Sequence, residues 1–223
     1  MSTWLVTGAN RGIGLEMCRQ LVERGDAVIA VCRNSSTELE QLGVRMVDGV
    51  DVREPGDCST LRKALDGTQI DVLMNVAGVL RRQSFGEIDD DSVAAMRLQF
   101  DTNAIAPVLV TQALADLMAK GGKVGIVTSR MGSIADNDSG GSYGYRMSKA
   151  AVNAAGKSLA VDLKPRGISV ALLHPGYVRT DMTGHNGLID PDESVRGLLA
   201  RMDALDLATS GGFWHQNGET LPW

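Results

Sequence analysis

The sequence predicts an α/β fold, a doubly wound parallel sheet of about seven strands with helices on both faces, formed by residues 1–223 as a single domain. Short apolar runs alternate with segments of helical periodicity along the whole chain, which is typical of a parallel sheet whose crossovers are helices. The connections between these segments are mostly short. The length is sufficient for a substantial core, and 43% of the residues are hydrophobic.

Apolar runs mark the expected strands. The segment from Trp4 to Val6 is the first, and Ala27 to Val31 is a second, continuous run. The third alternates loosely between apolar and polar residues, and the later ones are again short and mainly apolar. In order, we expect strands at residues 4–6, 27–31, 44–50, 71–76, 123–128, 168–173 and 212–214.

Helical periodicity marks the segments between these strands. In the first of them, Ile13, Met17 and Leu21 fall near one face, as in an amphipathic helix. We expect helices at residues 13–23, 57–65, 91–98, 103–118, 143–163 and 192–202, with a polar, glycine-rich loop at residues 131–142.

The net charge, the cysteines and the histidines limit which partners and which cellular location we expect for the protein. The chain has 22 basic and 27 acidic residues, a net charge of −5, which disfavours nucleic acid or an anionic membrane surface as the main partner. No apolar stretch has the length of a membrane span, and the first expected strand starts too close to Met1 to leave room for a signal peptide. The three cysteines and three histidines lack metal-site spacing, so we expect reduced thiols, no metal and a cytoplasmic protein.

A glycine-rich turn follows the first expected strand. Gly8, Gly12 and Gly14 sit where the chain turns from strand to helix. Glycines allow a sharp turn and a close approach to a pyrophosphate, and the N-terminus of the helix attracts the anion. The spacing Gly-x-x-x-Gly-x-Gly differs from the usual Gly-x-Gly-x-x-Gly, but its position after the first strand favours dinucleotide binding.

A second motif, Tyr145-x-x-x-Lys149, lies in the expected helix at residues 143–163. Positions four apart share one face of a helix, so the phenol and the ammonium project side by side. A phenol normally titrates near pH ~10, and a neighbouring cation lowers that pKa by stabilising the phenolate. The pair is therefore a candidate acid and base for interconverting an alcohol and a carbonyl.

Together, Thr7-Gly8-x-x-x-Gly12-Ile13-Gly14 and Tyr145-x-x-x-Lys149 resemble the short-chain dehydrogenase/reductase family over essentially the whole chain. The resemblance implies a Rossmann-type fold and reversible reduction of a carbonyl by hydride from a nicotinamide cofactor. The chain end from Gly211 to Trp223, with the segments 130–134 and 140–143, is similar to the small branch of carbonyl reductases and C-factor-like signalling proteins. That branch implies reduction of an aldehyde, ketone or quinone.

The resemblance also assigns catalytic roles. Tyr145 donates the proton, Lys149 lowers the pKa of the phenol and contacts the ribose of the nicotinamide, and Asn103 supports a water leading to the lysine. Asn103 is equally compatible with capping a helix. Ser129 is expected to orient the substrate, with Ser133 as the competitor.

Cofactor contacts follow from the same resemblance. Cys32 stands where relatives that prefer NAD often carry Asp, and Arg33 follows it, so Arg33 and Arg11 indicate NADP(H), with NAD(H) as the second choice. Arg33 is alternatively a solvated surface charge, and Asp51 a turn or capping residue. The full set of expected contacts is Gly8, Asn10, Arg11, Gly12, Ile13, Gly14, Arg33, Asp51, Val52, Asn75, Ala77, Gly78, Tyr145, Lys149, Pro175, Gly176, Val178 and Thr180.

Two questions stay open at this level. A dinucleotide-binding signalling protein with incidental turnover is the alternative to an enzyme, although a sensor needs only the glycine-rich turn. Small residues on the helix that carries Tyr145, such as Ala151, Ala154 and Ala155, permit either close packing within a monomer or a homodimer. The partners expected are a small carbonyl or alcohol substrate and a second copy of the chain.

Overall fold

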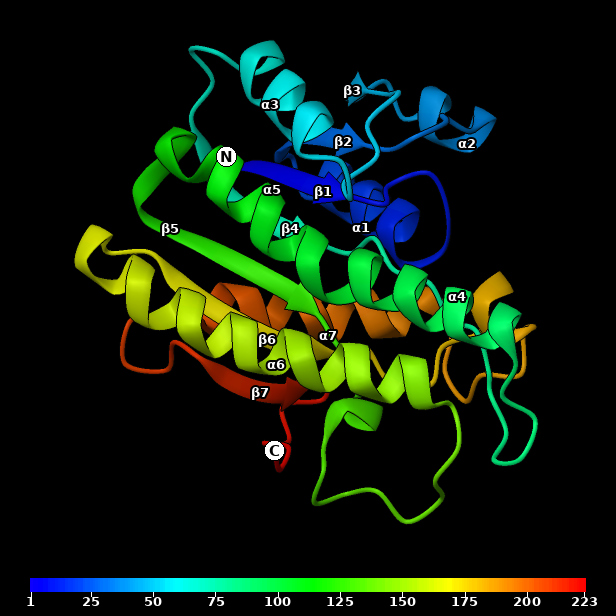
Figure 1. Cartoon of the computed structure of the whole chain (residues 1–223). Helices are drawn as coiled ribbons and strands as arrows, with labels where there is room; N and C mark the ends of the chain where they lie inside the picture. Colours follow the sequence, from blue (N-terminus) through cyan, green and yellow to red (C-terminus); the bar gives the residue numbers. More distant parts are fainter.

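The computed structural model describes residues 1–223, and its seven strands form one sheet in which every pairing is parallel, so the predicted fold class is confirmed. The order across the sheet is β3-β2-β1-β4-β5-β6-β7 (Figure 1). The strands are β1 (Thr3–Thr7), β2 (Ala27–Val31), β3 (Arg45–Val47), β4 (Ile70–Asn75), β5 (Met118–Val127), β6 (Ser169–His174) and β7 (Gly212–His215).

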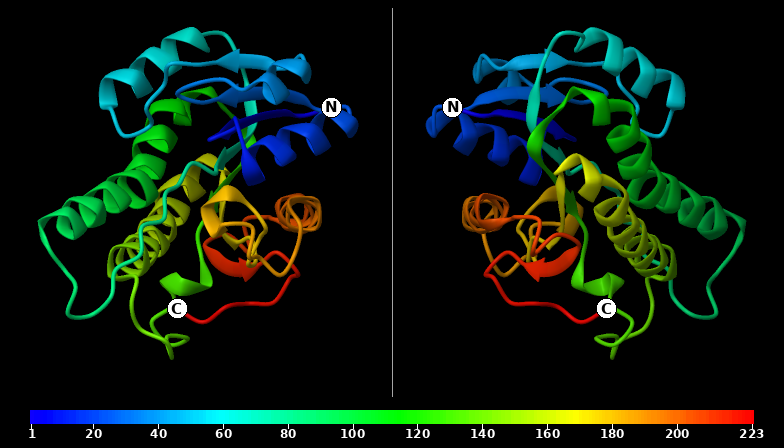
Figure 2. Two further views of the ribbon diagram at one scale, coloured as in Figure 1. Left: turned by 90° about the vertical axis from the view of Figure 1, so that its right-hand side faces the viewer. Right: turned by 90° about the vertical axis from the view of Figure 1, so that its left-hand side faces the viewer.

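Helices cover both faces of the sheet, as the two side views show (Figure 2). One apolar cluster joins the sheet to α3, α5 and α6, and a second joins it to α1, α2 and α7. α4 packs beside α6. The helices are α1 (Gly12–Glu23), α2 (Thr37–Gln41), α3 (Pro55–Ala64), α4 (Asp90–Phe100), α5 (Ala106–Leu114), α6 (Tyr143–Leu163) and α7 (Pro191–Ala204). None of them combines the length and apolar character needed to cross a bilayer.

α4 and α5 follow one another without a loop. A π-helical turn at Asp101–Ile105 joins them and carries Asn103. Such turns are rare and occur mostly inside α-helices, frequently at functional sites. Asn103 is therefore inside a helical path, and not at the start of a helix as a capping residue would be. Shorter 3₁₀ turns are at Ala115–Leu117, Arg130–Gly132, Lys164–Arg166 and Asp181–Thr183.

Several element boundaries differ from expectation, and one helix is additional. The third strand ends at Val47, because Gly49 turns the chain with a φ of +71°, so Asp51 lies in a loop and does not end a strand. β5 begins at Met118, earlier than expected, through a register irregularity against β4. The short α2 was not expected from periodicity, and Ser36 caps it by accepting from the Leu39 N–H.

The sheet places a crevice at the carboxyl ends of β1 and β4. These strands are neighbours, with Trp4 beside Val72 and Val6 beside Met74. The chain leaves β1 towards β2 on one side and leaves β4 towards β5 on the other. In open α/β sheets such a reversal of strand order leaves room for a ligand.

Candidate functional site

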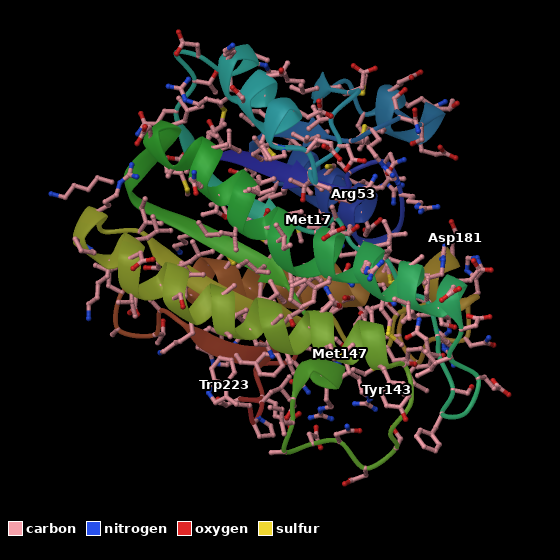
Figure 3. All side chains as sticks on the ribbon, viewed as in Figure 1. Met17, Arg53, Tyr143, Met147, Asp181 and Trp223 are labelled. Atoms are coloured by element: carbon pink, nitrogen blue, oxygen red, sulfur yellow. The ribbon has the colours of Figure 1, made fainter.

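A cavity of about 590 Å³ occupies this crevice. It runs from the loops after β2 and β3, past the glycine-rich turn, to α6 and the loop after β6. Figure 3 labels two of its lining residues, Arg53 and Asp181, which come from the loops after β3 and β6. The expected site residues that line it are Gly8, Asn10, Arg11, Gly12, Ile13, Gly14, Arg33, Asp51, Val52, Ala77, Gly78, Tyr145, Lys149, Pro175 and Thr180.

The N-terminus of α1 opens into the cavity. Arg11 is the N-cap residue, and no side chain forms a capping hydrogen bond. The first turn of the helix contains no acidic residue. The first backbone N–H groups of α1 therefore remain available to an anion. Gly8 has a φ of +66°, and a Cβ there would lie 2.8 Å from the Ala77 Cα. The turn after β1 thus approaches the loop after β4 too closely for any side chain, leaving bare backbone along the cavity floor.

Thr7 holds the turn after β1 against the loop after β4. Its hydroxyl oxygen accepts hydrogen bonds from the N–H groups of Val76 and Ala77, at 3.0 and 3.3 Å. Both donors are backbone groups, so Thr7 holds the loop after β4 without a polar side chain at Val76.

Tyr145 and Lys149 lie on one face of α6 at the centre of the cavity. The Lys149 Nζ is 5.7 Å from the centroid of the Tyr145 ring and donates to the Val127 carbonyl at 2.9 Å. Burial lowers the pKa of Lys149 to about 8. Burial also raises the pKa of Tyr145 to about 12, against the lowering effect of a hydrogen bond with Ser129. The pKa of the phenol is therefore raised in this structure, and not depressed as the helix spacing predicts; burial is the largest cause.

Ser129 and Ser133 have different surroundings. Ser129 follows β5; its hydroxyl oxygen accepts from the Met131 N–H at 3.1 Å, and its side chain is near enough to the Tyr145 phenol to lower the pKa of that phenol. Ser133 donates to the Trp223 carbonyl at 3.1 Å and accepts from the Asp136 N–H. Ser133 thus joins the loop to the segment that ends at Trp223, whereas Ser129 meets Tyr145.

Asn103 stands behind Lys149. Its Nδ2 donates to Ser148 Oγ at 3.0 Å, and a Cβ added at Gly78 would lie 3.2 Å from its Oδ1 and 3.9 Å from the Lys149 Nζ. The asparagine is buried and does not line the cavity. It joins the π turn, the loop after β4 and α6.

Four other expected residues also lie outside the cavity lining. The Asn75 amide faces α5, where it donates to Thr111 Oγ1 at 3.3 Å. Val178 is buried and bridges to Ile189. Gly176 turns the chain after β6 with a φ of +87°. Ser129 is buried beside the Tyr145 phenol.

Cationic side chains dominate the cavity, although the chain as a whole is acidic. The basic residues that line it are Arg11, Arg33, Arg53, Arg81 and Lys149, against the carboxylates of Asp51 and Asp181. A cavity with this excess of positive charge attracts phosphates. Sequence reasoning missed Arg53 and Arg81; their only signal was their place one and three residues after the expected contacts Val52 and Gly78.

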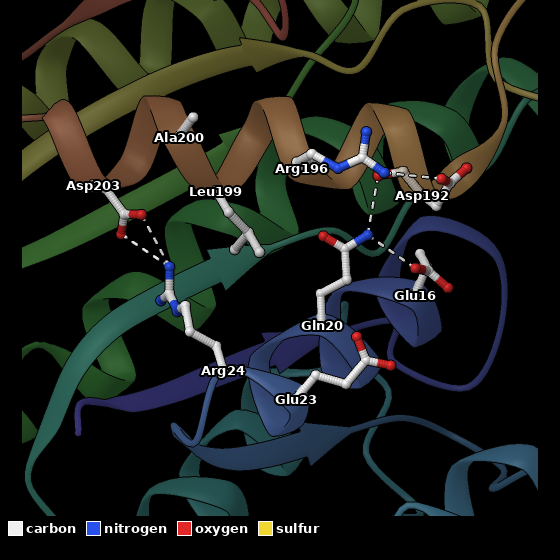
Figure 4. Close-up of a pocket in the computed structure, with 9 residues that line it drawn as sticks. All are labelled: Glu16, Gln20, Glu23, Arg24, Asp192, Arg196, Leu199, Ala200 and Asp203. Carbon is white, nitrogen blue, oxygen red and sulfur yellow. Dashed lines mark hydrogen bonds and ion pairs between the residues drawn. The ribbon is translucent and has the colours of Figure 1, made fainter.

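A second hollow, of about 520 Å³, lies between α1 and α7 (Figure 4). Both of its arginines are paired: Arg24 binds Asp203, and Arg196 binds Asp192. The Gln20 amide donates to Glu16 and to the Asp192 carbonyl. Nothing in it resembles a nucleophile or an acid and base pair, so the cavity at the strand ends is the candidate active site.

The fold and this cavity define a dinucleotide-binding α/β protein. The family model described as short chain dehydrogenase matches residues 2–188. The 1-hydroxy-2-glutathionyl-2-methyl-3-butene dehydrogenase of Rhodococcus sp. (strain AD45) is 42% identical over 229 residues, covering 100% of both chains. C-signal of Myxococcus xanthus is 44% identical over 157 residues, 69% of this chain and 93% of its own.

Solved structures give the same result. The NADPH-bound carbonyl reductase from chicken fatty liver matches with a TM-score of 0.89 and 29% identity, covering 100% of this chain and 99% of its own. The chain belongs to the short-chain dehydrogenase/reductase family of oxidoreductases.

Proposed function

We propose that the protein is an NADPH-dependent reductase of aldehyde, ketone or quinone carbonyls, acting reversibly. The observation that carries the proposal is the pair Tyr145 and Lys149 in one cationic cavity, with Ser129 buried beside the phenol. The bare backbone at Gly8 and Ala77 and the free N-terminus of α1 fit a dinucleotide pyrophosphate.

The geometry supports the proposed catalytic roles. The bound nicotinamide supplies the hydride. Ser129, which lies beside the Tyr145 phenol, is proposed to donate to the same substrate oxygen. Tyr145 gives its proton to that oxygen during reduction and takes it back during oxidation. Lys149 on the same face provides the positive charge that stabilises the phenolate left by proton transfer. Asn103 acts behind it by holding the π turn against α6.

The simplest test combines binding and turnover. Nicotinamide fluorescence should report NADPH binding by both the wild type and Tyr145→Phe, because the phenol hydroxyl is needed for proton transfer and not for binding. Turnover of a carbonyl panel by Tyr145→Phe should fall by roughly 10²-fold or more. An active Tyr145→Phe would exclude the tyrosine as the proton donor.

Arg33 and Arg11 support the choice of NADPH over NADH, because they line the cavity near Cys32, which carries no negative charge. The carbonyl reductase of known structure has NADPH bound. Arg33→Ala should weaken NADPH binding while leaving NADH binding unchanged. Unchanged NADPH affinity in Arg33→Ala would overturn this assignment.

The substrate pocket is proposed to be open and permissive. The segment after Thr180 adds few large apolar side chains; Met182 lines the cavity, whereas Leu188 is 76% exposed. The Rhodococcus relative is named as a dehydrogenase of a glutathionyl alcohol, which supports assaying alcohol oxidation beside carbonyl reduction. Activity confined to one bulky steroid in a broad panel would contradict a permissive pocket.

A signalling protein with incidental turnover is the second candidate, supported by the 44% identity to C-signal. A reductase needs Tyr145 for its cellular function, whereas a signalling protein needs only the dinucleotide-binding turn. A cellular phenotype that survives Tyr145→Phe but is lost on disruption of the glycine-rich turn would favour signalling.

We also propose a cytoplasmic homodimer without nucleic-acid or membrane partners. The three cysteines are free and buried. Phe100 and Ile105, on the helical path of α4 and α5, and Met147 and Val161 on α6 expose apolar surface. Light scattering at working concentration should give twice the chain mass; a monomer mass would contradict the dimer.

A further inference from the structure

In the part of the cavity formed by the loops after β2 and β3, one guanidinium, that of Arg53, binds both carboxylate oxygens of Asp51. Arg53 Nε donates to Asp51 Oδ1 at 2.9 Å, and Arg53 Nη2 donates to Asp51 Oδ2 at 2.5 Å. The Arg53 backbone N–H adds a third donor to Oδ1 at 3.1 Å. Both side chains are mostly buried, with 29% and 19% of their surface exposed.

Arg33 stands beside this pair and is bound far less closely. Its Nη1 lies 3.9 Å from Asp51 Oδ2, and 59% of its side chain is exposed. The Arg33 guanidinium therefore keeps its donors free for another anion. The two arginines and Asp51 all line the cavity.

An unpaired Asp51 would oppose the binding of a phosphate next to Arg33. Its negative charge would repel the phosphate directly. Its oxygens would also compete for Arg33, since a guanidinium and a carboxylate form paired hydrogen bonds readily. Arg53 prevents both effects, because it satisfies the two oxygens and cancels the charge.

We propose that Arg53 is a positioning residue for cofactor choice: by pairing with Asp51 it leaves Arg33 free to bind the 2′-phosphate of NADP(H). This inference rests on the NADPH-dependent function proposed above. The pKa of Asp51 lies below its ordinary value, first because of the Arg53 hydrogen bond, which accords with a permanently charged, paired carboxylate.

Binding both oxygens of Asp51 and neutralising its charge requires an arginine. Only a guanidinium presents two donors at the spacing of two carboxylate oxygens. The backbone of Asp51 is also held in place, because its N–H donates to Asp57 Oδ2 at 2.9 Å. Asp101 and Glu54 are the other acids that act on Arg53. Arg53 thus adds positive charge without itself needing to reach the phosphate.

The test measures the ratio of NADH to NADPH dissociation constants in variants of the full-length protein. Arg53→Met keeps the length of the side chain and removes its charge. We expect the ratio to fall roughly tenfold, mainly through weaker NADPH binding. The ratio is unaffected by any fraction of protein that fails to fold, because both cofactors meet the same sample.

A second substitution separates neutralisation from a merely structural role. Asp51→Asn added to Arg53→Met removes the charge that Arg53 had balanced, so the ratio should return to within about threefold of the wild type. Asp48→Asn added to Arg53→Met is the matched control, because Asp48 is an exposed acid near Cys32 that does not line the cavity. That control should leave the ratio low.

The outcomes distinguish this inference from the function on which it rests. A wild type that prefers NADH would overturn the NADPH proposal itself. A wild type selective for NADPH whose ratio is unchanged in Arg53→Met would overturn the role of Arg53 alone. The role of Arg53 would also be overturned if Asp48→Asn restored the ratio as well as Asp51→Asn does. The ratio would then depend on the total charge near the cavity and not on the pairing of Arg53 with Asp51.

Discussion

The amide of Asn103 holds both polar backbone atoms of Val79. Its Oδ1 accepts from the Val79 N–H at 2.8 Å, and its Nδ2 donates to the Val79 carbonyl at 2.9 Å. Asn103 comes from the π turn, whereas Val79 belongs to the loop after β4 that lines the cavity. One buried side chain therefore fixes the position of a loop along which the cofactor is proposed to lie.

Replacing Asn103 by Leu should destabilise the protein and weaken cofactor binding together. The variant leaves the polar groups of Val79 and the Ser148 hydroxyl without their partner, which costs about 2–4 kcal/mol in the free energy of unfolding. Urea denaturation and NADPH titration measure the two effects. Asn137→Leu, in an exposed turn, is the control and should change neither by much. An Asn103→Leu protein as stable as the wild type would contradict the structural role.

Substitution of Ser129 should affect turnover, whereas substitution of Ser133 should affect stability. Ser129→Ala removes the hydroxyl that lies beside the Tyr145 phenol, so turnover should fall roughly 10²-fold while NADPH affinity stays the same. Ser133→Ala removes the bond to the Trp223 carbonyl, so it should lower stability by about 1 kcal/mol and leave turnover largely intact. Steady-state kinetics and thermal denaturation measure both. A fully active Ser129→Ala would move the substrate-orienting role to Ser133.

The fold was readable from the sequence because its signals are local. Strand runs and helix periods each depend on neighbouring residues, and the helix Tyr143–Leu163 begins and ends where its pattern predicts. The third strand was misjudged because Gly49 turns the chain where apolar alternation continues as far as Val50.

The site was readable only where a motif lies within one segment. The turn from Gly8 to Gly14 and the pair Tyr145 and Lys149 satisfy that condition. The pairing of Ser129 with Tyr145 spans a loop whose path the sequence does not give, so the choice between Ser129 and Ser133 required coordinates. The raised pKa of Tyr145 was missed for a related reason, since burial depends on the whole fold.

Gly132 should tolerate no side chain. A Cβ at this position would lie 2.7 Å from the Lys149 carbonyl carbon and 2.8 Å from its oxygen, both rigid backbone atoms of α6. Gly132→Ala should therefore lower the free energy of unfolding by about 1–3 kcal/mol. It should also reduce turnover, because the turn that begins after Ser129 would move away from α6.

Gly56→Ala is the matched control for that substitution. Gly56 lies in the first turn of α3, and a Cβ there would have no neighbour within 4 Å. The change should be neutral or stabilising by about 0.4–1 kcal/mol, because alanine has less backbone freedom in the unfolded chain. Equal denaturation midpoints for Gly132→Ala and Gly56→Ala would show that the turn accommodates a methyl group.

Lys149 should give the protein a distinctive dependence of stability on pH. Burial lowers its pKa from 10.5 to about 8. Between those two values the unfolded chain binds the proton that the folded chain has released. Stability rises with pH wherever the unfolded state holds more protons. The contribution of Lys149 to stability is therefore lowest below pH 8, where the folded protein carries the buried charge, and increases up to about pH 10.

Comparison with Lys149→Met isolates this effect from the other titrating groups. Cys18, whose pKa burial raises to about 12, titrates in both proteins and cancels in the difference. Below pH 8 methionine avoids the buried charge, so the variant should gain stability relative to the wild type, and that advantage should shrink by about 2 kcal/mol between pH 8 and pH 10. Urea denaturation at half-unit pH intervals measures the difference. A difference that stays constant with pH would mean that Lys149 keeps its ordinary pKa in the folded protein, and that the ammonium beside Tyr145 is better solvated than its burial implies.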